Sequence, residues 1–120
     1  MLTKEPGLRD KKFRYHHLGI PTDKPLEGEH YLAEYKVFHR GFENSEFGIE
    51  WMRYEEGAKV PELVKRIPHV AFEVDDIREA IRDRKVIIEP NSPSDGVIVA
   101  FIEEDGVPIE FLQFTEKSRR

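Results

Sequence analysis

Hydrophobic and polar residues alternate along much of this chain in the manner of strands. Short segments with an alternating or continuous apolar pattern, the signal expected of half-buried or buried strands, cover residues 13–20, 35–39, 47–54, 69–74, 86–89, 97–102 and 109–114. Clusters of proline, glycine and polar residues separate these segments, as turns require. The pattern therefore predicts a fold dominated by strands.

Helix signals are fewer and lie between the predicted strands. Apolar residues at i, i+3 and i+4 predict a helix over residues 77–82, and Asp75 or Asp76 can cap its N-terminus. Shorter helices are expected over residues 60–66 and between residues 25 and 33. Together with the strands they predict an α+β protein.

Length and composition limit the classes of protein that this chain can represent. Its 120 residues have room for one domain with one core, so residues 1–120 are expected to form a single domain. A net charge of -5, with acidic and basic residues interspersed, excludes the extended basic surface that a nucleic acid needs. The longest apolar run, residues 97–102, is far shorter than the ~20 residues of a membrane-spanning helix. Neither nucleic acid nor membrane is expected as a partner.

The chain carries no sign of secretion. Its first residues contain no apolar segment of the kind found in secretory signals. It has no cysteine and therefore no disulfide framework. A soluble, cytoplasmic protein is the expectation.

Two short patterns recur in the same order along the chain, which indicates an internal repeat. The segment His-Leu-Gly-Ile that begins at His17 is echoed by His-Val-Ala-Phe, which begins at His69. The segment Ile-Glu-Trp-Met-Arg-Tyr around Glu50 is echoed by Ile-Glu-Phe-Leu-Gln-Phe around Glu110. Each half thus contains a histidine strand followed by a glutamate strand.

The repeat divides the chain into two modules, at about residues 13–56 and 67–115. The strand before each glutamate is also expected to correspond, residues 36–39 with residues 99–102. Histidine and glutamate are 33 positions apart in the first half and 41 in the second, where residues 86–89 supply a further strand.

The repeated histidines and glutamates are candidates for one site. Because side chains of a strand alternate between faces, Glu50 and Glu110 share a face with apolar groups. An ionised carboxylate in such a place needs a cation or a hydrogen-bond partner. Taken singly, each of the four residues fits an ordinary polar strand position. If the two halves pack as symmetric mates, however, His17 and His69 meet both acids in one cleft, and the set then favours a metal site.

Two imidazoles and two carboxylates form a ligand set suited to a divalent Zn, Ni, Co, Fe or Mn ion. One or two positions on the ion would remain for water or substrate. An open position of this kind is typical of a catalytic centre.

These motifs resemble the vicinal-oxygen-chelate superfamily, which includes glyoxalase I, methylmalonyl-CoA epimerase, extradiol dioxygenases, and the fosfomycin and bleomycin resistance proteins. The resemblance spans roughly residues 13–114. Residues 15–20 resemble the opening strand of the superfamily, residues 68–76 the start of its second module and residues 108–112 its closing glutamate strand.

The resemblance implies a fold and a set of ligands. The fold is two βαβββ modules that form a cupped mixed sheet, known as the glyoxalase/bleomycin resistance/dioxygenase fold. The implied metal ligands are His17, Glu50, His69 and Glu110.

The ligand set is most similar to that of glyoxalase I. This similarity implies a metal-dependent lyase or isomerase, like lactoylglutathione lyase, that acts on a small α-hydroxy-carbonyl substrate by proton transfer through a metal-bound enediolate. Glu110 is expected to be the principal base and Glu50 its partner. The alternatives are a non-catalytic, resistance-type protein that binds a small molecule, and an epimerase or dioxygenase of the superfamily.

Three further expectations concern the surroundings of the site. Tyr15, His39, Arg40 and Arg53 are candidate substrate contacts, although solvation or surface ion pairs explain the charged ones equally well. His16 should point to the face opposite His17, because the two are consecutive in a strand. A homodimer is expected, since a strongly curved sheet has edges that need covering.

Overall fold

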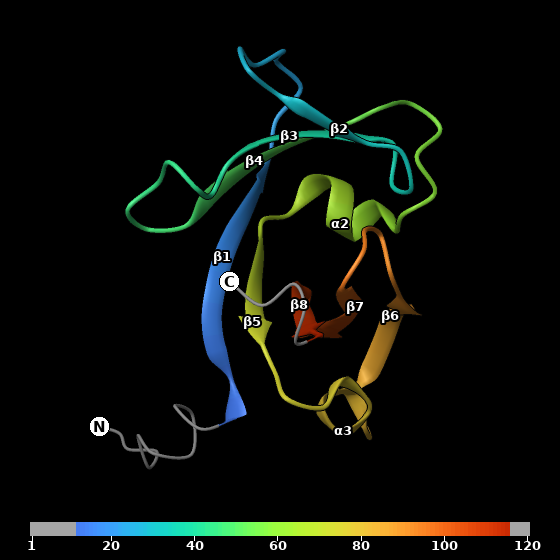
Figure 1. Ribbon diagram of the computed structural model, residues 1–120. Coiled ribbons are helices and arrows are strands. Elements are labelled where there is room, and N and C mark those ends of the chain that lie inside the picture. Colours follow the sequence, from blue (N-terminus) through green and yellow to red (C-terminus); the bar gives the residue numbers. More distant parts are fainter. Residues whose placement is uncertain (1–11, 116–120) are drawn as a thin grey trace, which may run out of the picture.

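The computed structural model describes residues 12–115, and its strands form one mixed sheet of eight strands that curls around a cavity (Figure 1). The strands lie in the order β2-β3-β4-β1-β5-β8-β7-β6. Their bounds are β1 (Arg14–Pro21), β2 (His30–Leu32), β3 (Val37–Gly41), β4 (Ile49–Tyr54), β5 (His69–Glu73), β6 (Lys85–Asn91), β7 (Val97–Glu104) and β8 (Val107–Phe114). Within residues 12–115 the helices are α2 (Glu62–Arg66) and α3 (Ile77–Ile81).

Each predicted strand segment overlaps an observed strand. The helix expected between residues 25 and 33 is wrong, because residues 30–32 form β2 and pair with β3. Pro25 and Gly28, whose φ is +77°, favour turns in this segment instead. Among the described residues, the first half therefore has no helix between its first two strands.

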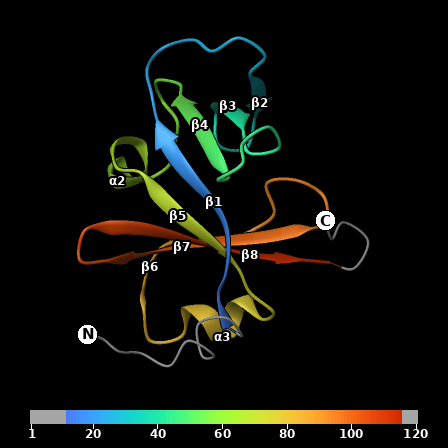
Figure 2. The same cartoon turned by 90° about the vertical axis from the view of Figure 1, so that its left-hand side faces the viewer.

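Helix α3 forms where its pattern predicts it. The Asp76 carboxylate accepts hydrogen bonds from the backbone N–H groups of Arg78 and Glu79, which caps the helix. Its buried residues Ile77 and Ala80 pack in one hydrophobic cluster with core residues of β7 and β8. Figure 2 shows α3 at one end of the molecule, while β2, β3 and β4 lie at the other end. None of the helices described here has the length and apolar character needed to span a membrane.

The register of the sheet reproduces the sequence repeat. Leu18 pairs with Ile49 in the parallel pair of β1 and β4, and Val70 pairs with Ile109 in the parallel pair of β5 and β8. The two histidine strands, β1 and β5, lie side by side and antiparallel, with Leu18 opposite Val70. The halves are thus related by an approximate twofold axis between β1 and β5.

One expected correspondence is out of register. Gly41 of β3 pairs with Glu50, and Phe101 of β7 pairs with Glu110, so Gly41 and Phe101 are counterparts. The match of residues 36–39 with residues 99–102 is therefore wrong. A short apolar pattern cannot fix a register that depends on hydrogen bonds between strands.

Candidate metal centre

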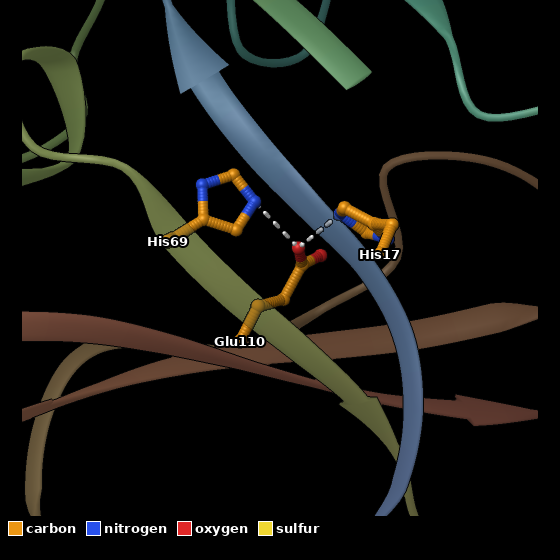
Figure 3. A group of neighbouring side chains, drawn as sticks. All are labelled: His17, His69 and Glu110. Carbon is orange, nitrogen blue, oxygen red and sulfur yellow. Dashed lines mark ion pairs between the residues drawn. The ribbon is translucent and has the colours of Figure 1, made fainter. Parts of the chain in front are cut away.

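Three adjacent strands at the middle of the sheet bring the first candidate ligands together. His17 comes from β1, His69 from β5 and Glu110 from β8, and Figure 3 shows their side chains pointing toward one another. Glu110 Oε1 lies 3.2 Å from His17 Nε2 and 3.1 Å from His69 Nε2. One ligand atom from each residue lies within 4.8 Å of the other two, so the group could hold a metal ion.

Glu110 is a buried charge that both histidines stabilise. Burial by itself would raise the pKa of its carboxyl group, but the adjacent imidazoles of His17 and His69 hold this pKa at about 2. Only 7% of Glu110, 5% of His17 and 1% of His69 is exposed to solvent. This burial excludes the reading of these residues as ordinary solvated strand positions.

Two features of the His69 imidazole bear on metal binding, namely the surroundings of its Nε2 atom and its close contact with Gly19. Its Nε2 atom is buried and, among the described residues, has no hydrogen-bond partner of good geometry, although it lies close to Glu110. A buried polar atom without such a partner is costly, and coordination of a cation would remove that cost. The ring also lies directly over Gly19, where a Cβ atom would come within 2.1 Å of Cε1.

Glu50 lies beside this group but is turned partly away from it. Its Oε1 atom is 3.7 Å from His17 Nε2, while its Oε2 atom accepts a hydrogen bond of 2.9 Å from His39 Nδ1. The structure thus gathers His17, His69 and Glu110 into one group and places Glu50 at its edge. The role of all four residues as metal ligands stays a prediction.

His16 is a functional candidate that sequence reasoning placed incorrectly. In the pairing of β1 with β5, Tyr15 lies opposite Phe72 and His17 opposite Ala71, so His16 is the extra residue of a β-bulge. It therefore faces the same cavity as His17, rather than the opposite face.

A β-bulge leaves no mark in a single strand, so the orientation of His16 could not be predicted from the sequence. His16 and His17 share a hydrogen bond of 2.7 Å between their Nδ1 atoms. A contact of this kind fixes the ring orientation of a histidine ligand.

The candidate substrate contacts divide into two pairs. His39 and Arg40 line the cavity. Arg53 instead pairs with Glu29 and packs over the Phe38 ring, and the Tyr15 hydroxyl donates to the backbone oxygen of Phe47. Arg53 and Tyr15 are not among the residues that line the cavity.

The cavity above the site has a volume of about 670 Å³, within the usual range for a small-molecule site. All five histidines of the chain line it. Aromatic and aliphatic side chains form much of its wall, among them Tyr35, Phe42, Met52, Tyr54, Val97, Val99, Phe101, Leu112 and Phe114. Burial raises the pKa of the Tyr35 and Tyr54 hydroxyls, so both remain protonated near neutral pH.

Comparison with known proteins identifies the fold. No family model matches the chain, and no curated protein matches its sequence. A hypothetical protein of Bacillus halodurans C-125 is similar in structure, with a TM-score of 0.67, 24% identity and coverage of 90% of this chain and 99% of that one. Methylmalonyl-CoA epimerase from Mycobacterium tuberculosis has a TM-score of 0.64, 18% identity and coverage of 98% of this chain and 95% of its own.

Together, the comparisons and the curled mixed sheet confirm the α+β glyoxalase/bleomycin resistance/dioxygenase fold. At these identities the likeness extends to the fold alone. The closer likeness to glyoxalase I, the module boundaries, the homodimer and the cytoplasmic location stay predictions.

Proposed function

We propose that this protein is a metal-dependent lyase or isomerase, epimerases included, that moves a proton at a carbon next to a carbonyl group. The observation that carries the proposal is the buried group of His17, His69 and Glu110 at a large cavity, with Glu50 beside it. A divalent ion held by this group would supply a Lewis acid that acidifies such a C–H bond. An epimerase among the proteins of similar fold supports this class of reaction.

The geometry favours a division of labour between the two glutamates. Glu110 places one carboxylate oxygen between both imidazole Nε2 atoms, which is the position of a ligand. Glu50 lies on the cavity wall, and its Oε1 atom is not shared between two imidazoles. We therefore assign proton removal to Glu50 and metal binding to Glu110, whereas the sequence favoured Glu110 as the principal base and both glutamates as metal ligands.

The cavity also favours one class of substrate by its charge. Four carboxylates line it, from Glu27, Glu43, Glu50 and Glu110, and Arg40 is the only lysine or arginine among the described lining residues. Glu27 and Glu43 are exposed to solvent. A divalent ion would offset the charges of Glu50 and Glu110, so the excess of Glu27 and Glu43 over Arg40 is what disfavours a substrate with phosphates or several carboxylates. We propose an uncharged or cationic substrate with an apolar body.

Exchange of a substrate proton with solvent tests the proposed reaction. The metal-loaded protein is expected to catalyse exchange of the α-protons of dihydroxyacetone or 2-hydroxyacetophenone with deuterated water, followed by NMR. Glu50→Gln should slow this exchange by about 10²- to 10⁴-fold, the usual contribution of a general base. Glu43→Gln, at the rim of the same cavity, is the matched control and should exchange at the unaltered rate.

Two results would contradict this scheme in different ways. Undiminished exchange in Glu50→Gln would return the role of base to Glu110. Absence of exchange with every α-hydroxy ketone, in protein shown to contain metal, would favour the alternative of a small-molecule-binding protein without turnover.

A series of chelators with a constant head group tests the proposed substrate charge. Benzohydroxamate should bind the metal-loaded protein, and its 4-trimethylammonium derivative should bind at least as tightly. The 4-phosphono derivative should bind more than about tenfold more weakly, because the carboxylates of the cavity repel its charge. The double variant Glu27→Gln/Glu43→Gln should reduce this difference. Tightest binding of the phosphono compound in calorimetry would show that the charge argument is wrong.

A further inference from the structure

The two halves of the site differ in the position of their glutamates. His17 and His69 are counterparts in the repeat, as are Glu50 and Glu110. Glu110 nevertheless reaches both imidazole Nε2 atoms, at 3.1 and 3.2 Å. Glu50 reaches only one of them among the described ion pairs, at 3.7 Å. Something in the first half therefore holds Glu50 back.

One difference between the two halves is His39 of β3, whose counterpart on β7 is not a histidine. His39 pairs with Met52 in the first half, and Val99 pairs with Leu112 in the second. The sheet register makes His39 and Val99 counterparts, but only His39 has a hydrogen-bond donor. Its Nδ1 atom lies 2.9 Å from Glu50 Oε2, whereas the apolar side chain of Val99 can offer Glu110 no hydrogen bond. Because an ionised carboxylate only accepts, Nδ1 of His39 carries the hydrogen.

We propose that His39 is a positioning residue that keeps Glu50 out of the inner coordination shell of the metal centre. This inference rests on the proposed metal centre. With Glu50 held back, the protein supplies three ligands and the ion keeps open positions for substrate, as catalytic sites require. Glu50 then stays next to the ion as a carboxylate that is bonded to His39 and not to the metal. Substituting valine at position 39 copies the second half and should turn Glu50 into a fourth ligand.

Binding of Co²⁺ to the full-length protein tests this role without any measurement of activity. His39→Val should bind Co²⁺ about 10- to 100-fold more tightly than the wild type. In the wild type the hydrogen bond from His39 competes with the metal ion for Glu50, and this range corresponds to the free energy of one charge-assisted hydrogen bond. Its visible absorption spectrum should also differ from that of the wild type, because a carboxylate replaces a water molecule on the ion. His39→Asn, which keeps an N–H donor, should bind Co²⁺ as the wild type does.

Two further variants separate the role of His39 from general effects on the cavity. His30→Val removes the histidine that lies opposite His39 on β2 and should leave Co²⁺ affinity unchanged. In the double variant His39→Val/Glu50→Gln, the gain in affinity should disappear, since it depends on Glu50. Glu50→Gln alone should lower the affinity by less than about 100-fold, the upper limit for a group next to the ligands, because Glu50 is not itself a ligand while His39 holds it.

The outcomes distinguish this inference from the proposed function. Wild-type protein that binds Co²⁺, together with a His39→Val variant of equal or weaker affinity, would overturn the role of His39 alone. A loss of Co²⁺ affinity in Glu50→Gln as large as that expected for a ligand would also overturn it, because Glu50 would then be a ligand even with His39 present. A wild-type protein that binds no Co²⁺ would overturn the metal centre itself and this inference with it.

Discussion

Replacement of Glu110 with glutamine should weaken the binding of divalent metal by more than about 100-fold. Loss of a residue that only hydrogen-bonds to a metal ligand has a smaller effect, about 10- to 100-fold. In the described part of the chain, Glu110 is the only carboxylate that lies close to both imidazole Nε2 atoms, and it is almost wholly buried. Glutamine keeps the size of the side chain but removes its charge, so a cation would have to be bound mainly by two neutral histidines. Titration with Co²⁺ or Zn²⁺, followed by calorimetry, measures this loss directly.

The control for this variant is Glu89→Gln, at an exposed position of β6. It changes the net charge of the protein equally and should bind metal as the wild type does. Metal should also raise the melting temperature of wild-type and Glu89→Gln protein, because a ligand that binds only the folded state stabilises it. This rise should be absent in Glu110→Gln at the same metal concentration. Wild-type affinity in Glu110→Gln would show that the ion is held elsewhere.

A single methyl group at Gly19 should remove His69 from the site. Gly19 lies opposite His69 in the pairing of β1 with β5, and the imidazole ring covers it. An added Cβ atom would lie 2.1 Å from Cε1, 2.6 Å from Nε2 and 2.8 Å from Nδ1 of that ring. Such contacts are impossible, so in Gly19→Ala the buried ring must move. We expect metal affinity to fall by more than about tenfold and the free energy of unfolding to fall by about 1–3 kcal/mol, as in other overpacked cores.

The symmetry of the sheet provides a matched control for Gly19→Ala. Ala71 is the counterpart of Gly19 and lies opposite His17, where a methyl group is already tolerated. Ala71→Gly should cost about 0.5–1 kcal/mol of stability, the usual penalty for glycine in a strand or helix, and should retain metal binding. Chemical unfolding and metal titration of both variants separate the two effects. Full metal affinity in Gly19→Ala would mean that His69 is not a ligand.

Three residues of the candidate site could be predicted from the sequence, but the position of a fourth could not. His17, His69 and Glu110 could be found because each occupies a repeated position in a strand, and both regularities can be read along one chain. The position of Glu50 could not be found in this way, because its rotamer depends on His39, which belongs to a neighbouring strand. A sequence gives the donor groups of a site, but the hydrogen bonds between them depend on distances of a few tenths of an ångström.

The sequence by itself determined the positions along the chain of seven of the eight described strands, the capped helix α3 and the internal repeat, since these follow from local alternation, local capping and the identity of residues. Only the tertiary structure decided the β-bulge that turns His16 toward the cavity, the correspondence of His39 with Val99 and the need for glycine at position 19. Each of these depends on which residue of one strand lies opposite which residue of another. That register is fixed by hydrogen bonds and packing across the whole sheet, and no single strand contains the information.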